Sequence, residues 1–205
     1  MSQKEILREE IKKILKNTAK EDFRSQGNRA ADLLRTSPVW NRYTAVFLFM
    51  SMNSEIDTQV LVETAFKEGK KVFIPKVEGE KLVFYPLLSP DGPWSRGPFG
   101  IREPAAFPAV PPYKTSEGKP APPEDFPALI ITPGLAFDRQ GNRLGRGRAY
   151  YDRFFAKLDE EGMRYTALGL CMNFQIVPRV PAGENDKKMD GLLTGTELFL
   201  VKGKK

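Results

Sequence analysis

The sequence of 205 residues contains no histidine and only one cysteine, Cys171. Without histidine, a Ser-His-Asp or Cys-His hydrolase and a HExxH metalloprotease are excluded. A single thiol forms no internal disulfide, and it leaves no ligand set for structural zinc. Any chemistry must therefore depend on carboxylate, Lys, Arg and Tyr side chains, and the cysteine usage is typical of an intracellular protein.

Long apolar runs are also missing. The longest, residues 45–50, is far shorter than the roughly 18 residues of a membrane span, and the first residues are charged rather than signal-like. We therefore expect a soluble, cytoplasmic protein. The 32 Lys and Arg exceed the 26 Asp and Glu, which gives a net charge of +6. This balance favours an anionic partner without choosing between a nucleotide, a nucleic acid and a polyacid.

Two helices are predicted at the start of the chain. Ser2 and Glu5 form the pattern of a capping box, and the apolar residues that follow recur on one helix face, which predicts a helix over 2–18. A second helical pattern covers 21–35 and ends before Pro38, because proline biases the preceding residue away from helical geometry.

The next segments predict an α/β protein with a parallel sheet. Residues 43–50 form a continuous run of aromatic and branched side chains, typical of a strand buried on both faces. Asp57 or Thr58 can cap a helix that Gly69 ends, and a short strand is predicted at 71–74. This order is a βαβ unit. Further strands are predicted at 128–132, 166–170, 191–193 and 198–201, with a helix over 148–161.

Residues 86–127 carry 12 of the 17 prolines and few long apolar runs. We expect this segment to be irregular or partly extended. A strand is predicted directly after it, at 128–132, and that strand needs the earlier ones as neighbours. We therefore predict a single domain over 1–205, with no boundary in the proline-rich segment.

The most informative stretch runs from Thr132 to Arg153. It holds five arginines within 15 residues, interleaved with Gly141, Gly145 and Gly147. Glycines let backbone N–H groups approach an anion, and the loop leads into a predicted helix N-terminus, which favours phosphate. The pattern therefore indicates a polyphosphate site, although it lacks the Walker A lysine. A basic surface loop with turn glycines is the alternative interpretation.

Charged residues elsewhere can complete such a site. Asp152 and Asp186 are candidates to hold magnesium, which is usually bound by one or two carboxylates together with phosphate oxygens and waters. Each can instead be an ordinary turn or helix-start aspartate. Lys4 and Arg8 share one helix face and can grip a phosphate together, or they can simply belong to a solvated face.

Two further candidates follow the first predicted strand. Glu55 lies just beyond its carboxyl end, where ligands bind in open α/β sheets, so its carboxylate can pair with the amino-pyrimidine edge of a heterocycle. Turn capping is the alternative role. Met50 and Met52 are core residues by default, and packing against a flat ring ligand is the rarer alternative.

Several of these segments resemble the 5-formyltetrahydrofolate cyclo-ligases, also called methenyltetrahydrofolate synthetases. The strongest similarity is PGLAFD at 133–138, followed by GNRLGRG at 141–147 and YYD at 150–152. Supporting segments are 4–8, MNSEID at 52–57, FIPK at 73–76, GIREP at 100–104, and VPAGEND at 180–186 leading to Asp190. They occur in the family's order across nearly the whole chain.

The resemblance implies a three-layer α/β sandwich with a mostly parallel, Rossmann-like open sheet. It also implies an enzyme that uses ATP and Mg²⁺ to convert 5-formyltetrahydrofolate to 5,10-methenyltetrahydrofolate, releasing ADP and phosphate. In the implied mechanism the formyl oxygen attacks the γ-phosphate, N10 closes the ring and phosphate leaves. No protein nucleophile is required, which suits a chain without histidine.

The resemblance also assigns site residues by position. Metal binding falls to Asp152 and Asp186, and stabilisation of the transferring phosphoryl group to Arg146 and Arg148. The ATP-binding residues it implies are Lys4, Arg8, Arg143, Leu144, Gly145, Arg146, Gly147, Arg148, Ala149, Tyr150 and Tyr151. The folate-binding residues it implies are Met50, Glu55, Arg146 and Tyr150, with the rest of the loop 146–150.

The chain departs from the family at two positions. Ala149 stands where the family usually has glycine, and Arg148 replaces a lysine or glycine. If residue 149 adopts a positive φ, alanine costs on the order of 1 kcal/mol there. Arginine in place of lysine keeps the charge and changes the donor geometry.

Two other functions stay open from the sequence. A diverged paralogue would keep the fold and act on another phosphate-bearing substrate. A basic RNA-binding module would use the Arg/Tyr loop as a charged stacking surface, but it leaves Glu55, Asp152 and Asp186 without a role. We expect a monomer that acts on a small molecule and binds neither nucleic acid nor membrane.

Overall fold

The structure is a computed structural model that describes residues 1–92, 94–97, 102–104 and 127–201. Its five α-helices are α1 (Gln3–Asn17), α2 (Lys20–Arg35), α3 (Pro38–Arg42), α4 (Gln59–Lys67) and α5 (Tyr150–Glu160). Helix α1 begins as its sequence predicts. The Ser2 side chain accepts a hydrogen bond from the Glu5 N–H, and the Glu5 carboxylate accepts one from the Ser2 N–H, which completes a capping box.

A seven-stranded sheet lies at the centre, in the order β11-β10-β9-β6-β1-β2-β3. Its strands are β1 (Ala45–Phe47), β2 (Lys71–Glu78), β3 (Lys81–Leu87), β6 (Ala128–Thr132), β9 (Tyr165–Leu170), β10 (Gly191–Leu193) and β11 (Leu198–Leu200). The inner pairings are parallel, and only the edge strands β3 and β11 are antiparallel to their neighbours. The predicted α/β class with a mostly parallel sheet is confirmed.

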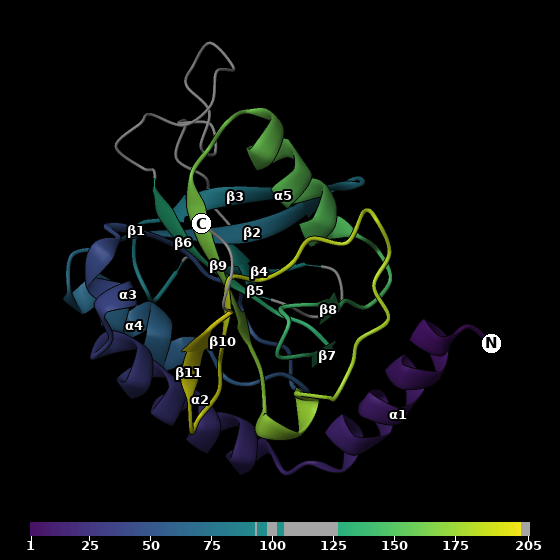
Figure 1. The fold of residues 1–205 in the computed structure, drawn as a ribbon. Coiled ribbons are helices and arrows are strands. Elements are labelled where there is room, and N and C mark those ends of the chain that lie inside the picture. Colours follow the sequence, from purple (N-terminus) through teal and green to yellow (C-terminus); the bar gives the residue numbers. More distant parts are fainter. Residues whose placement is uncertain (93, 98–101, 105–126, 202–205) are drawn as a thin grey trace.

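Alternate residues of the central strands supply two separate cores. Val46 and Leu129 pack on one face with apolar residues of α1, α2, α3 and α4. Phe47 and Ile130 pack on the opposite face, together with Phe154 of α5. Figure 1 shows this arrangement, with α5 above the sheet and α2, α3 and α4 below it. Helices on both faces of a sheet that is buried on both sides give the three predicted layers.

Three details differ from the sequence predictions. Pro38 does not only end a helix: Ser37 caps the Trp40 N–H, and Pro38 occupies the first turn of α3, where its missing N–H costs nothing. The first strand is shorter than 43–50, although Leu48, Phe49 and Met50 stay buried. Strand β3 was not predicted, and it follows a tight turn at Gly79, whose φ is 60°.

The proline-rich segment is partly extended where it is described. Strand β3 enters it, and β4 (Trp94–Arg96) pairs with β5 (Arg102–Pro104) in a small separate sheet. Residues 105–126, with most of the remaining prolines, lie outside the described residues, so the expectation of irregular structure there stays a prediction. A second small sheet, β7 (Ala136–Phe137) with β8 (Arg143–Leu144), shapes the loop that the sequence singled out.

Candidate active site

The candidate site lies where the sheet reverses its order. From β1 the chain crosses through α4 to β2 on one side, and from β6 it crosses through α5 to β9 on the other. Helices α4 and α5 cover opposite faces, so the segments that leave β1 and β6 diverge. Open α/β sheets bind ligands in the crevice at such a point. Glu55 follows β1 here, and the loop from Pro133 to Ala149 follows β6.

Asp138 fixes the shape of the loop after β6. Its fully buried carboxylate accepts hydrogen bonds from the backbone N–H of Gln140, Asn142 and Val180, and from the Asn142 side-chain amide. The Val180 contact also ties the loop to the segment that carries Asp186. No role was predicted for Asp138 from the sequence. Its place in the motif at 133–138, four positions before Asn142, is the signal that could have identified it.

Gln175 provides a second buried support that was not predicted. Its side-chain amide donates to the carbonyls of Gly134 and Leu135 at 2.9 and 3.0 Å, and its side-chain oxygen accepts from the Met172 N–H. These bonds satisfy backbone groups at the start of the loop that would otherwise be buried without partners. The loop is therefore held by buried polar contacts on two sides.

Helix α1 brings its two predicted phosphate ligands to this loop. Lys4 Nζ lies 2.5 Å from Asp186 Oδ2. The Arg8 guanidinium donates from Nε to the Gly145 carbonyl at 3.0 Å, and it lies beside Gly147. The spacing of four therefore does place both cations on the same side of α1, facing the glycine-rich loop, rather than on an unrelated solvated face.

Arg143 and Asp152 form the most buried ion pair of the site. Arg143 Nη2 lies 2.9 Å from Asp152 Oδ1, with side-chain exposures of 4% and 18%. Asp152 Oδ1 also accepts from the Lys187 N–H. The Arg143 Nε group and the Tyr151 hydroxyl are buried and have no hydrogen-bonding partner among the described residues. Because buried polar groups are nearly always satisfied, these two mark a place where a ligand or water completes the structure.

Two pKa values in the site depart from their ordinary range. Burial, with the nearby Glu55 charge, raises the pKa of the Tyr151 phenol, so that it remains a neutral hydrogen-bond donor. Burial also acts to raise the pKa of Asp186. Hydrogen bonds from Lys4 and the Gly183 N–H, with the charges of Lys4 and Arg143, outweigh that effect and lower it. The Asp186 carboxylate is therefore firmly ionised.

Arg146 connects the two sides of the crevice. Its Nη2 lies 3.1 Å from Glu55 Oε1, with side-chain exposures of 40% and 11%. Glu55 Oε2 accepts from the Met52 N–H, so this carboxylate both closes its own turn and reaches the opposite loop. The turn-capping role and the functional role that the sequence left as alternatives are therefore compatible.

The loop ends in a strained residue. Ala149 has a φ of 53° and is the only residue other than glycine with a positive φ among the described residues. It precedes α5 as its N-cap, and no side chain caps the helix there. The exposed Arg148 forms no hydrogen bond or ion pair with any residue that the structure describes. An uncapped helix start beside a free guanidinium is suited to an anion.

The remaining predicted residues occupy different environments. Leu144 is buried in β8, and its carbonyl accepts from the Leu135 N–H, so it contributes backbone structure. Tyr150 is partly buried, with the Arg153 guanidinium 5.4 Å from its ring centre. Met50 is 4% exposed and packs in the core on the α1–α4 side, as its default interpretation predicts. Contact of Met50 with a ligand stays a prediction.

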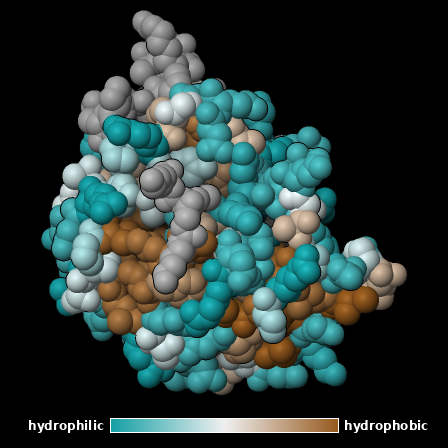
Figure 2. All heavy atoms as spheres, viewed as in Figure 1, coloured by the Kyte–Doolittle hydropathy of each residue, from teal (hydrophilic) through white to brown (hydrophobic). Residues whose placement is uncertain are grey.

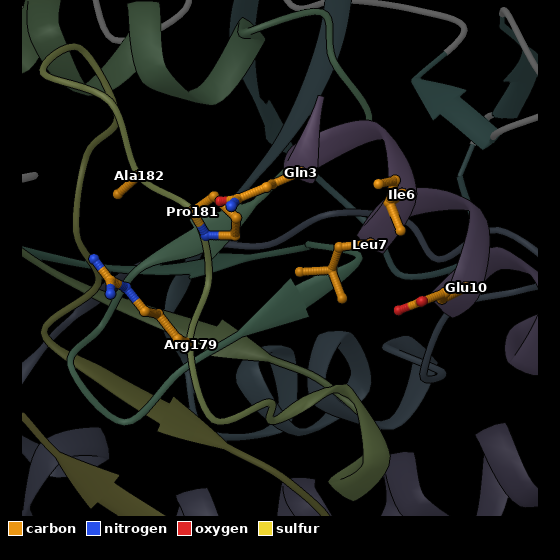
Figure 3. Close-up of a pocket in the computed structure, with 7 residues that line it drawn as sticks. All are labelled: Gln3, Ile6, Leu7, Glu10, Arg179, Pro181 and Ala182. Carbon is orange, nitrogen blue, oxygen red and sulfur yellow. The ribbon is translucent and has the colours of Figure 1, made fainter. Parts of the chain in front are cut away.

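A cavity of about 680 Å³ lies on the adjacent side of α1. Figure 3 shows side chains of α1 facing the segment 179–182. Its lining residues are Gln3, Ile6, Leu7, Glu10, Arg179, Pro181 and Ala182. Ile6 is 46% exposed, and apolar side chains gather over α1 at the lower right of Figure 2. Gln3 and Ala182 flank the Lys4–Asp186 region in sequence, so the cavity adjoins the polar site. None of the residues that line this cavity was predicted to belong to the site.

The donor set suits a magnesium ion that arrives with phosphates. Among the described residues there is no group of three or more His, Cys, Asp and Glu side chains that could hold a metal. Asp152 and Asp186 each keep one carboxylate oxygen free of hydrogen bonds to described residues. Magnesium commonly takes one or two carboxylates and completes its coordination with phosphate oxygens and waters. The two aspartates therefore fit this ion when a nucleotide supplies the remaining ligands.

The fold and site together define an α/β protein of the open-sheet class, with its polar groups at the switch point where such sheets bind ligands. The model of the 5-formyltetrahydrofolate cyclo-ligase family matches residues 1–195. The chain belongs to this family, and it is an enzyme of that class. Within the part of the chain that the structure describes, no helix is long and apolar enough to cross a membrane.

Individual relatives agree with this assignment. The chain is 34% identical to a probable 5-formyltetrahydrofolate cyclo-ligase of Schizosaccharomyces pombe, over 77% of this chain and 78% of the relative. It is 28% identical to the Mus musculus 5-formyltetrahydrofolate cyclo-ligase, over 94% and 93%. The 5,10-methenyltetrahydrofolate synthetase structure from Aquifex aeolicus superposes with a TM-score of 0.78 at 28% identity, covering 100% of this chain and 95% of that one.

Proposed function

We propose that this protein converts 5-formyltetrahydrofolate to 5,10-methenyltetrahydrofolate at the expense of ATP, with release of ADP and phosphate. One observation supports this most directly: at the carboxyl ends of the central strands, the structure brings together Lys4 and Arg8, the loop 143–152 and Glu55. Cations for a polyphosphate and a carboxylate for a heterocycle are then close enough to serve one reaction.

The triphosphate of ATP would lie along the loop before α5. Lys4 and Arg8 would contact it from α1, while Arg148 and the free N–H groups of the α5 N-terminus would contact it from the loop. Gly147 has a φ of 103° and no side chain, so the backbone there can approach a phosphate closely. The adjoining cavity, with Ile6, Leu7 and Pro181, offers apolar surface for the base.

Asp152 and Asp186 would hold Mg²⁺ beside these phosphates. When bound, the ion would neutralise charge on the phosphate oxygens during transfer. The second carboxylate oxygen of each aspartate is the atom available for this purpose. Arg143, which is fixed against Asp152 and the Pro133 carbonyl, keeps the Asp152 carboxylate oriented.

The folate would lie on the β1 side of the crevice. Glu55 is placed to accept hydrogen bonds from the amino-pyrimidine edge of the pterin, and Tyr150 offers an aromatic face. Met50, which is buried three residues beyond the end of β1, is assigned to this side as well. Arg146 pairs with Glu55 in the ligand-free protein. It therefore lies between Glu55, which would bind the pterin, and the loop that would bind the phosphates.

The reaction needs positioning and charge stabilisation rather than a protein nucleophile. The formyl oxygen of the substrate attacks the γ-phosphate, N10 closes the ring on the activated carbon, and phosphate leaves with that oxygen. Arg146 and Arg148 would stabilise negative charge on the transferring phosphoryl group. The side chains present, without any histidine, are sufficient for this chemistry.

Charge pairing also bears on the RNA-binding alternative. Arg143 and Arg146 are paired with Asp152 and Glu55, and Lys4 with Asp186. An RNA-binding surface would give these three carboxylates no role, because the RNA backbone is itself anionic. The paired arrangement therefore favours a small site in which cations and carboxylates serve different parts of one ligand set.

A direct test distinguishes these possibilities. Purified protein with 5-formyltetrahydrofolate, ATP and Mg²⁺ is expected to produce the methenyl chromophore, while sugar phosphates with the same nucleotide give no turnover. A protein that binds RNA with steep salt dependence and leaves the folate unchanged would instead support the binding-module function.

A further inference from the structure

The acidic residues of the site are held by cations of the same chain. Lys4 Nζ lies 2.5 Å from Asp186 Oδ2, and Arg143 Nη2 lies 2.9 Å from Asp152 Oδ1. A phosphate would compete with the two carboxylates for Lys4 and Arg143, while a divalent cation would have to approach carboxylates whose charge these cations already balance. Phosphate binding to Lys4 or Arg143 therefore has to rearrange an existing pair.

The two pairs differ in how readily they can rearrange. Arg143 is 4% exposed and also donates to the Pro133 carbonyl, so its guanidinium is fixed. Lys4 is 31% exposed in the first turn of α1, and Asp186 is its only hydrogen-bonding partner among the described residues. A lysine side chain has a flexible four-carbon stem and can turn toward another anion without disturbing the helix.

We propose that Lys4 substitutes for the divalent cation in the ligand-free protein, and that Asp186 becomes a metal ligand only after a bound triphosphate has drawn Lys4 away. This inference rests on the proposed function, because it takes the triphosphate to bind beside α1. It makes metal binding conditional on nucleotide binding, so that the protein does not collect free divalent cations.

The electrostatics of the ligand-free site support this order. A free divalent cation that approaches Asp186 meets the positive charges of Lys4 and Arg143, which already neutralise the carboxylate. Moving the Lys4 ammonium to a phosphate restores the negative charge at Asp186. By thermodynamic linkage, the metal must then strengthen nucleotide binding by the same factor as the nucleotide strengthens metal binding.

The first experiment removes the internal cation. Lys4→Met keeps the aliphatic stem of the side chain but lacks its charge. Mn²⁺ replaces Mg²⁺ in this experiment, because it binds the same oxygen ligands and is paramagnetic. Free Mn²⁺ is measured by electron paramagnetic resonance without nucleotide. We expect Lys4→Met to bind Mn²⁺ about 5-fold or more tightly than the unsubstituted protein. Lys12→Met, which removes the Lys12–Glu9 pair on the exposed side of α1, is the control and leaves Mn²⁺ affinity unchanged.

The second experiment removes the internal carboxylate. In Asp186→Asn, Lys4 is free for phosphate from the start, so AMP-PNP in the presence of EDTA is expected to bind about 5-fold more tightly. Glu184→Gln removes the same charge from an exposed position two residues away, and it controls for the general effect of charge. Its gain in affinity is expected to be less than about 2-fold, because no ion pair with Lys4 is released.

The outcomes separate the inference from the function on which it rests. If neither Mn²⁺ binding by Lys4→Met nor metal-free AMP-PNP binding by Asp186→Asn tightens beyond the controls, the substitution of Lys4 for the cation is wrong. If the unsubstituted protein does not bind AMP-PNP even with Mn²⁺ present, the proposed function itself fails. Circular dichroism spectra of both variants show whether they are folded.

Discussion

Arg146 and Glu55 are 91 positions apart in the sequence, and their side chains meet at 3.1 Å across the crevice of the sheet. Each residue comes from a loop that leaves a different central strand. The pair therefore links the loop that would hold phosphate with the turn that would hold the pterin. Under the proposed function, a substrate that binds Glu55 would compete with Arg146 for this carboxylate, and a displaced Arg146 would be free to turn toward the transferring phosphoryl group.

Glu55→Gln tests this relationship. The amide retains the shape of the side chain but loses the charge that would recognise the pterin edge, so we expect the KM for 5-formyltetrahydrofolate to rise about 10-fold or more. The free energy of unfolding should change by less than about 1 kcal/mol, because the Arg146 side chain is 40% exposed and water weakens its pairing with Glu55. Initial rates at varied folate concentration and urea unfolding measure the two effects.

A matched control for this substitution lies on α4. Glu63 accepts a hydrogen bond from Gln59 and lies outside the candidate site, so Glu63→Gln should leave the KM for folate unchanged. If Glu55→Gln and Glu63→Gln have the same KM, Glu55 does not bind the substrate.

Ala149→Gly is expected to stabilise the protein. Alanine at a φ of 53° carries a steric cost that glycine does not, so the free energy of unfolding should rise by about 0.5–1 kcal/mol. Ala156→Gly, in the interior of the same helix, should instead lower it by about 1 kcal/mol, because glycine weakens a helix interior. Opposite signs in urea unfolding establish the strain, whereas a loss of stability in both variants would refute it.

Asp152→Asn should separate folding from catalysis. Asparagine can still accept the Arg143 hydrogen bond, but the buried guanidinium loses its counter-charge, so we expect a loss of about 1–3 kcal/mol in stability with the fold retained. Magnesium-dependent turnover should fall at least about 100-fold. Asp159→Asn, on the exposed side of the same helix, is the control for activity. Near-normal turnover by Asp152→Asn would exclude a metal role for Asp152.

Acid unfolding should report the Asp186 ion pair. The pKa of Asp186 is lowered from 3.8 in the folded protein, so the folded state binds its proton less readily than the unfolded chain. The stability from this group is fully present above the unfolded pKa, and it is lost as the pH falls through the folded pKa. Asp186→Asn should show a smaller loss of stability below about pH 4 in urea unfolding. An unchanged acid profile would contradict the pairing.

The sequence predicted the central strands, and it singled out the loop that carries the candidate site, because both depend on local patterns. Buried parallel strands read as continuous apolar runs, and the glycine- and arginine-rich loop is visible in the residue order. The antiparallel strand β3 was missed because its short hairpin turn at Gly79 was not recognised. Helix α3 was missed because Pro38 was interpreted only as a helix end, although proline also begins helices.

The supports of the site could not be predicted in the same way. Gln175 acts through hydrogen bonds to backbone carbonyls about 40 positions away, and no local pattern reveals the bond from the Val180 N–H to Asp138, although the bonds between Asp138 and Asn142 lie within the motif. The pairing of Lys4 with Asp186 spans 182 positions. In contrast, the resemblance to the family predicted a cost of alanine at residue 149 if that residue adopts a positive φ, and its φ is 53°.

The most direct test of the central claim is a turnover measurement that counts both products. With 5-formyltetrahydrofolate, ATP and Mg²⁺, the methenyl chromophore and ADP should appear in a one-to-one ratio, and omission of ATP should abolish both. Chromophore formation that does not require ATP, or ADP release without ring closure, would contradict phosphoryl activation of the formyl oxygen at this site.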